Sequence, residues 1–333
     1  MKFKLPFADP DEVHIINPLW DASGGSEWRS MNLYTILSRV CKVSLWTEFK
    51  PDPSLTEQFP IRRIKPRKLR FPKTGVFIFV GVYFNIGGWV KWARPRRIII
   101  VFNTLDYEAW NERKRFLAKY CRKPIETVYA CREMRQDQNN NDIVEHSPID
   151  IERFSMAVPE RISPDGQFII GRLSRDNLLK HHEGDISFYR KLAAQGIVIK
   201  IMGGTCLSPD LRDVENVELL PACALDAVSF MHSINCFYYR TAPEYYEAYG
   251  RVVLEAMACG LPVVCENRGG YNEFIEHGVN GFKFDTEKDA YEILMNLKNN
   301  PELRMNIGRV ARITIEKIYS ESYLSRLIEH YRQ

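Results

Sequence analysis

The sequence predicts an α/β protein built of two consecutive, doubly wound parallel-sheet domains, and three observations support this. Short apolar segments alternate with longer segments of helical periodicity. The segment 96–105 is apolar at almost every position, as expected of a parallel strand that is covered on both faces. The alternation stops once, at the Pro- and Gly-containing segment 155–166, and then restarts, and 333 residues suit two domains of about 150 residues each.

The first half begins with a strand at 13–20, the loop that holds Gly24 and Gly25, and a helix that we expect Ser26 to cap. The apolar run 75–90 contains Asn85 and is shorter than the ~20 residues of a membrane span, so we predict buried sheet there. The other elements expected in this half are a polar helix at 107–121 and strands at 42–49, 96–105, 125–131 and 143–154.

The second half repeats the alternation and closes with helices. Its expected strands are 167–173, 197–202, 214–220, 235–239 and 261–266, and its expected helices include 186–196, 225–234 and 252–260. We therefore predict an N-terminal domain at 1–157, a C-terminal domain at 158–316, and a last helix, at about 317–333, that packs back on the first domain. Two such domains imply a cleft, and open α/β sheets bind ligands at the carboxyl ends of their strands.

Composition and charge limit the classes of partner and the cellular compartment that we expect for this protein. The net charge of +4 is too small to indicate nucleic acid as a partner. Basic residues cluster at 62–73 and 91–97, which is either a solvated face or a surface for anionic lipid headgroups or a lipid-diphosphate acceptor. Eight scattered cysteines without a CxxC pair, and no apolar leader segment, predict a cytoplasmic protein, with peripheral membrane contact through the two basic segments as the further expectation.

The segment 243–284 carries the most chemistry. Glu247 precedes Gly250 and Arg251, where a helix is expected to start, and Glu255 lies on that helix. The free N–H groups and positive dipole of a helix start suit a diphosphate. A carboxylate accepts hydrogen bonds from neighbouring hydroxyls, such as those of a sugar or a ribose. Two carboxylates beside an anion site therefore suit a nucleotide sugar.

This segment resembles the C-terminal signature of the retaining GT-B glycosyltransferases of family 4, also called glycosyl transferases group 1: E-x-F/Y-G-x4-E-A-M-A-x-G-x-P-V-V, then G-G-x-x-E-x-I-x-x-G-x-x-G. Tyr249 is the aromatic residue of the motif. The resemblance implies two Rossmann-like domains that face each other across a cleft. It also implies that Glu247 holds hydroxyls of the donor sugar and Glu255 the nucleotide ribose.

The turn Gly171-Arg172-Leu173 resembles the family's G-R-L turn, whose arginine and a lysine five residues later neutralise the donor diphosphate. Arg172 matches the arginine, but Asn177 stands at the lysine position. Either an insertion moves Lys180 into place, or Arg175 substitutes. Fixed cations stabilise a departing diphosphate in place of Mg²⁺, so the resemblance implies neither a metal nor another cofactor.

Glycine pairs mark two further loops. Gly24-Gly25 resembles the family loop that faces the donor phosphate or the acceptor, and Gly203-Gly204 resembles the loop beside the nucleotide. A catalytic-region histidine often follows the fourth strand of the family, and here Asn103 or Asp106 takes that position.

Together these features predict a metal-independent, retaining hexosyltransferase. Its donor is a nucleotide-diphosphate sugar, with a UDP-sugar favoured, and its acceptor is a glycan or lipid-linked molecule in polysaccharide or glycoconjugate synthesis. Two alternatives remain open: a sugar-nucleotide 2-epimerase of the same fold, and a non-catalytic subunit that binds nucleotide sugars. A nicotinamide dehydrogenase is disfavoured, because no G-x-G-x-x-G follows the first strand.

Overall fold

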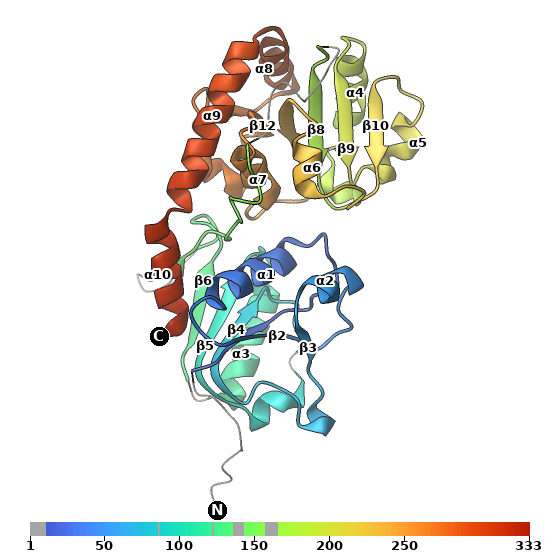
Figure 1. The fold of residues 1–333 in the computed structure, drawn as a ribbon. Helices are drawn as coiled ribbons and strands as arrows, with labels where there is room; N and C mark the ends of the chain where they lie inside the picture. The colour runs from blue at the N-terminus through green and yellow to red at the C-terminus, as the bar shows by residue number, and fades with distance from the viewer. Residues whose placement is uncertain (1–10, 86, 122, 136–142, 157–165) are drawn as a thin grey trace, which may run out of the picture. The chain divides into compact units, whose positions relative to one another are not determined.

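The computed structural model describes residues 11–85, 87–121, 123–135, 143–156 and 166–333, and the chain divides into two compact units (Figure 1). Unit 1 comprises residues 1–148 and 321–333, and unit 2 comprises residues 149–320. The sequence predicts that the N-terminal domain ends at residue 157 and that the last helix, which packs back on this domain, begins at about residue 317. Most of the expected linker, residues 157–165, lies outside the described residues.

Unit 1 contains a parallel sheet of seven strands in the order β3-β2-β1-β4-β5-β6-β7. The reversal of strand order beside β1 is the topological switch point of a Rossmann-like sheet. The strands are β1 (Val13–Ile16), β2 (Val43–Thr47), β3 (Ile61–Arg63), β4 (Thr74–Val80), β5 (Arg94–Phe102), β6 (Ile125–Tyr129) and β7 (Ile143–Val144).

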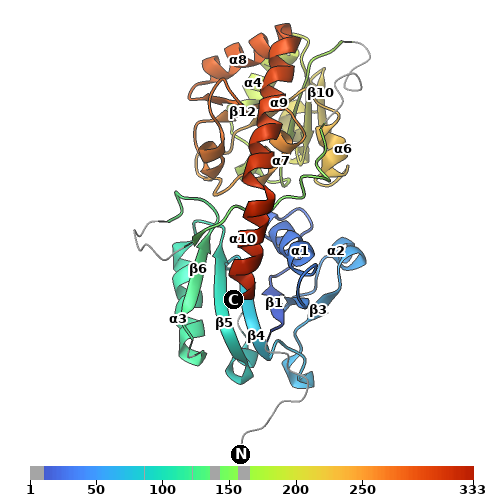
Figure 2. The ribbon, with the colours of Figure 1, turned by 60° about the vertical axis from the view of Figure 1, so that its left-hand side comes forward.

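Helices cover both faces of this sheet. Leu33 of α1 (Gly25–Leu37) and Leu327 of α10 (Glu321–Arg332) belong to one buried apolar cluster, and Leu117 of α3 (Tyr107–Tyr120) belongs to another. Figure 2 shows α10 lying against unit 1 beside α1. The unit also contains α2 (Pro53–Gln58) and two short 3₁₀ helices, η1 (Pro66–Lys68) and η2 (Gly88–Trp92).

Three local predictions for unit 1 can be compared with the structure. The apolar run does begin as buried sheet, because β4 is buried from Gly75 to Val80. The prediction that Ser26 caps α1 is wrong: Gly24 occupies the cap position, and the Ser26 hydroxyl donates to Glu27 instead. The strand expected at 143–154 is also wrong in extent, because β7 ends at Val144, and only one further backbone hydrogen bond, from the Glu145 N–H to the Tyr129 carbonyl oxygen at 2.9 Å, continues the pairing with β6 in the described residues.

Unit 2 contains a parallel sheet of six strands in the order β10-β9-β8-β11-β12-β13, again with a switch point beside its first strand. The strands are β8 (Ile169–Leu173), β9 (Val198–Met202), β10 (Val217–Leu220), β11 (Cys236–Tyr239), β12 (Val263–Glu266) and β13 (Phe282–Phe284). Its helices are α4 (Asp185–Ala193), α5 (Ser208–Leu211), α6 (Ala227–Met231), α7 (Arg251–Ala258), α8 (Glu287–Asn299) and α9 (Pro301–Ile318), and its 3₁₀ turns are η4 (Leu178–Lys180), η5 (Thr205–Leu207) and η6 (Gly270–Phe274).

The strands of unit 2 place alternate side chains on opposite faces of the sheet. Tyr238 joins the apolar cluster that α4 and α8 cover, so Tyr239 points to the other face. Gly260 follows α7 with φ +71°, the left-handed cap that the sequence predicts there. Of the helices in the described ranges, none is both long enough and apolar enough to cross a bilayer.

Candidate functional site

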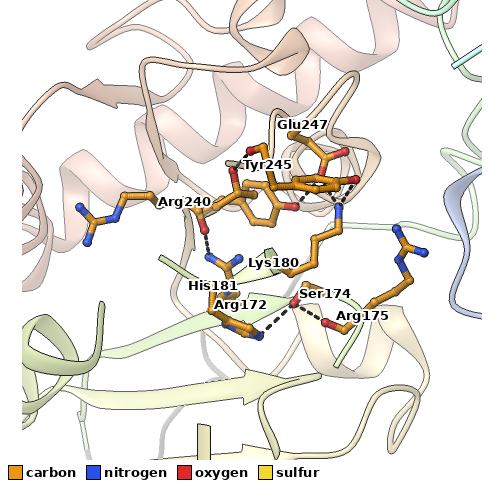
Figure 3. A network of polar contacts seen from close by, with 10 residues as sticks. Arg172, Ser174, Arg175, Lys180, His181, Arg240, Tyr245 and Glu247 are labelled. Atoms are coloured by element: carbon orange, nitrogen blue, oxygen red, sulfur yellow. Dashed lines mark hydrogen bonds and ion pairs between the residues drawn. The ribbon is translucent and has the colours of Figure 1, made fainter. Parts of the chain in front are cut away.

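A buried ion pair lies at the centre of the predicted site in unit 2. The Lys180 ammonium donates to Glu247 Oε2 at 2.6 Å and to the Tyr245 hydroxyl at 3.0 Å (Figure 3). The two charged side chains are only 10% and 15% exposed. Burial alone disfavours ionisation of both groups, but each charge stabilises the other, so the pKa of Glu247 lies below and that of Lys180 above its ordinary value. Both groups are therefore charged at neutral pH.

The turn η4 explains how Lys180 reaches Glu247. Asn177, at the position where the resembling family has lysine, caps this turn: its Oδ1 accepts the Leu179 N–H at 2.9 Å. The capped turn places Lys180, three residues later, with its ammonium 4.1 Å from the centre of the Tyr245 ring. Arg175 is exposed, and its charge also favours the ionised form of Glu247. Of the two cations that the sequence left open, Lys180 makes the direct contact.

Arg172 lies beneath this pair instead of on the surface. Its side chain is buried at 1% exposure, its guanidinium lies 4.7 Å from the centre of the Tyr239 ring, and it donates to the backbone carbonyl of Arg240. The Tyr239 hydroxyl donates to Glu247 Oε2 at 2.7 Å. Tyr239 thus links the buried guanidinium to the carboxylate above it.

A second buried ion pair fixes the backbone that Arg172 contacts. Arg240 follows β11, and its guanidinium donates to Asp185 Oδ1 at 2.6 Å and 3.0 Å. The Tyr238 hydroxyl donates to the same oxygen at 2.9 Å. Because Asp185 is the first residue of α4, this pair joins the end of β11 to the start of α4.

The glycine loop after β9 packs closely against the loop after β8. Gly203 has φ +82°, and a Cβ built on it would lie 1.9 Å from the Ser174 carbonyl oxygen, so this position requires glycine. A Cβ on Gly204 would lie 2.4 Å from Ile201 Cγ2. His181 Nε2 lies 2.9 Å from the Gly203 carbonyl oxygen, and burial lowers the pKa of His181 to about 3, so a neutral imidazole donates this bond.

The start of α7 provides backbone donors near Glu247. Gly250 is its N-cap, with φ +71°, and because it is a glycine it supplies no side-chain cap. Arg251 Nε donates to Glu255 Oε1 at 2.6 Å, and burial raises the pKa of Glu255 despite this partner. Tyr249 is buried, with its hydroxyl 2.9 Å from that of Tyr319, so it supports the loop from within the unit.

The remaining predicted residues form a separate group in unit 1, at the carboxyl ends of β1, β4 and β5. Gly24 is the N-cap of α1, again without a side-chain cap, and Gly25 has open space where a Cβ would lie. Asn103 follows β5: a Cβ built on Gly81 would lie 3.5 Å from its Oδ1. Asp106, the other candidate for the histidine position, caps α3 by accepting the Ala109 N–H at 2.9 Å.

Sequence reasoning missed four side chains of the unit 2 site: Tyr239, Tyr245, Asp185 and Arg240. The tyrosines could have been found from their positions, since Tyr239 ends an apolar strand and Tyr245 precedes Glu247 by two residues. The Arg240–Asp185 pair joins residues 55 positions apart, so only the sheet order brings them together.

Residues 161–314, most of unit 2, match the family model described as glycosyl transferases group 1. The structure resembles that of Anabaena HepE in complex with UDP, with a TM-score of 0.74 and 14% identity over 96% of this chain and 98% of HepE. Sucrose-phosphate synthase from Thermosynechococcus elongatus is similar to the same degree, with a TM-score of 0.74 and 14% identity over 97% of this chain and 98% of the other. The chain has the GT-B fold.

Curated relatives are similar over shorter stretches. Sucrose synthase 2 of Pisum sativum is 40% identical over 94 residues, which are 25% of this chain and 12% of that protein. An uncharacterised glycosyltransferase of Methanocaldococcus jannaschii is 32% identical over 127 residues, 37% of this chain and 34% of that protein. The matched stretches thus span about a third or less of the length of these relatives.

Proposed function

We propose that the protein is a glycosyltransferase that moves a hexose-type sugar from a nucleotide-diphosphate donor to a glycan or lipid-linked acceptor. The observation that carries the proposal is the Lys180–Glu247 pair, because it places a cation and a carboxylate within 2.6 Å in the unit that matches the glycosyltransferase model. HepE was solved with UDP and, in another crystal structure, with UDP-glucose, which makes a UDP-sugar the favoured donor.

Each group has a role in this proposal. Glu247 accepts hydrogen bonds from hydroxyls of the donor sugar, and Glu255 accepts those of the ribose. Lys180 and the exposed Arg175, with the positive end of the α7 dipole, bind the diphosphate and stabilise the charge that it gains as it leaves. Arg172 acts from beneath, because a buried guanidinium contributes a positive field without touching the ligand.

The transfer proceeds with retention of the anomeric configuration and without a metal ion. The bond between the anomeric carbon and the diphosphate oxygen breaks, and the acceptor oxygen bonds to the same face of the sugar. The leaving diphosphate takes the acceptor proton, so no protein nucleophile is required. The cations in the site supply the charge stabilisation that Mg²⁺ gives in other transferases.

The test compares Glu247→Ala with Glu244→Ala, an exposed carboxylate in the same loop. With UDP-sugars as donors, we expect sugar transfer, or slow donor hydrolysis when no acceptor is supplied, that survives EDTA. Loss of groups that contact the reacting centre typically costs about 100-fold or more in turnover. Glu247→Ala should show this loss and Glu244→Ala should not.

Other outcomes would replace the proposal. Full turnover by Glu247→Ala would remove this carboxylate from the site, and sensitivity to EDTA would contradict metal independence. Isomerised nucleotide sugar formed from donor alone would indicate a 2-epimerase. A rise in melting temperature with UDP, without any turnover of the donor, would indicate a non-catalytic binding subunit.

A further inference from the structure

Unit 1 carries a strongly basic surface at the end of its sheet where the central strands β4 and β5 begin. The chain between β3 and β4, which contains η1, and the chain before β5, which contains η2, meet there. Both lie at the same end of unit 1 in Figures 1 and 2. We call this surface the basic edge and define it by seven cations: Lys65, Arg67, Lys68, Arg70, Lys73, Lys91 and Arg94. Lys73 is half-buried and the other six are exposed.

The cations of the basic edge are not neutralised within the part of the chain that the structure describes. None of the seven forms an ion pair with a described carboxylate. The nearby acids Glu12 and Glu126, which lie at the same ends of the strands, are paired with Lys42 and Arg97 instead. Seven like charges that no described carboxylate pairs with repel one another, so an anionic surface would be attracted to them.

Two large apolar side chains protrude among these cations. Leu69 is 66% exposed and Trp92 is 57% exposed. Leu69 follows η1 in the left-handed backbone region, with φ 51°. It lies at the tip of a turn that is closed by backbone hydrogen bonds between Lys65 and Arg70. Trp92 ends η2, with its ring 6.2 Å from that of Phe71, which fixes it beside the same turn. The turn is therefore held in a shape that presents an aliphatic and an aromatic side chain to the outside.

We propose that the basic edge docks unit 1 on a bilayer that contains anionic phospholipids, with Leu69 and Trp92 inserted at the level of the headgroups. Lysine and arginine beside anionic lipids contribute attraction within a Debye length of the surface. Tryptophan prefers the interface between headgroups and acyl chains, and leucine gains by burial beyond it. The combination of charge and protruding apolar groups distinguishes a membrane surface from a purely electrostatic partner.

Membrane docking through the basic edge would leave the predicted substrate-binding residues of unit 1 accessible. It lies where β4 and β5 begin, whereas Gly24 and Asn103 lie at the opposite, carboxyl ends of the strands. Docking through the basic edge thus leaves those residues uncovered. A nucleic acid would also be attracted by the cations, but the exposed Leu69 side chain can neither pair nor stack with bases. Nucleic acid binding is therefore an outcome of the test and not the proposal.

The experiment measures binding of the full chain to phosphatidylcholine vesicles with and without phosphatidylglycerol. We expect binding that requires the anionic lipid and weakens with salt. Arg67→Ala, Lys68→Ala and Arg70→Ala, combined, should lower the partition coefficient about 100-fold, since each cation near an anionic surface contributes about fivefold. The matched control, Arg212→Ala, Arg309→Ala and Lys317→Ala, removes three exposed cations from unit 2 and should bind as the unaltered chain does.

A second variant separates insertion from simple charge attraction. Leu69→Asn with Trp92→Gln keeps every cation, and asparagine tolerates the left-handed backbone at residue 69. We expect this pair to lower binding at least about tenfold. The proposal is overturned by absence of binding to anionic vesicles, by equal losses in the two triple variants, or by unchanged binding of Leu69→Asn with Trp92→Gln. Tighter binding to a DNA oligonucleotide, independent of Leu69 and Trp92, would assign the surface to nucleic acid instead.

Discussion

Replacing Lys180 by methionine tests whether the ion pair of unit 2 holds its carboxylate in place. Methionine keeps an apolar stem of similar length but removes the ammonium, which leaves Glu247 at 15% exposure without its cation. The surface pair Lys288–Glu292 offers a matched control, because its side chains are 82% and 65% exposed. Lys288→Met removes the same charge where water can replace it.

The expected magnitudes differ because of burial. Removing one partner of a buried ion pair costs about 3–5 kcal/mol, since the remaining charge stays desolvated. The Tyr239 hydroxyl still donates to Glu247 in the variant, so we expect the lower end, about 3 kcal/mol. Lys288→Met should cost about 0–1 kcal/mol. Adding Glu247→Gln to Lys180→Met should recover most of the loss, because a neutral amide costs less to bury than a carboxylate.

The measurement must report on unit 2 alone, because a chain of two units need not unfold in one step. Hydrogen exchange of backbone amides in α7 and β11 under native conditions, at increasing urea, gives the opening free energy of this unit. The unaltered chain, Lys180→Met, Glu247→Gln and the double variant form a double-mutant cycle, which gives the coupling energy between Lys180 and Glu247. Equal costs for Lys180→Met and Lys288→Met, with a coupling energy near zero, would refute the reasoning.

Two further predictions concern backbone geometry and pH. Gly203→Ala should destabilise unit 2 by at least about 2 kcal/mol, because the φ of +82° and the Ser174 carbonyl oxygen both oppose a Cβ at this position. The control Gly196→Ala, with φ +71° and open space around the Cβ, should cost only about 1 kcal/mol. Similar losses of opening free energy in the two variants would show that the close approach to Ser174 is not what requires glycine at residue 203. Glu247 has a folded pKa below its ordinary value of 4.5, so its contribution to stability is present above pH 4.5 and is lost as the pH falls through the folded pKa. The urea midpoint of the unaltered chain should therefore fall more steeply below pH 4.5 than that of Glu247→Gln, and parallel curves would contradict the assignment.

The fold could be predicted because its signals are local. Apolar strands such as 96–105 need no knowledge of their neighbours to be recognised, and parallel sheets buried on both faces make them continuous. The failures lie where local and tertiary preferences compete. Ser26 has the right side chain for a cap, yet α1 begins at Gly25. The stretch after Val144 carries Ile149 and Ile151 at the two-residue spacing of a strand, yet β7 ends there at the edge of the sheet.

The site could be predicted in its residue types but not in its geometry. The spacing of Glu247 and Glu255 indicated carboxylates near a helix start, and the structure places them before and within α7. Spacing could not decide between Lys180 and Arg175, because the answer depends on the turn that Asn177 caps. The sequence also did not indicate which site residues are buried. Arg172 matches the arginine of the G-R-L turn, but its side chain is only 1% exposed and lies beneath Tyr239.

The return of α10 to unit 1 makes unit 2 an uninterrupted insertion within the sequence of unit 1. Ribosomes therefore complete all of unit 2 before unit 1 can acquire its last helix. Until then, Glu145 lacks the Tyr331 hydroxyl that bonds it at 3.0 Å, and the cluster around Leu327 stays open to water. Unit 1, although it begins first on the ribosome, is the last of the two to be finished.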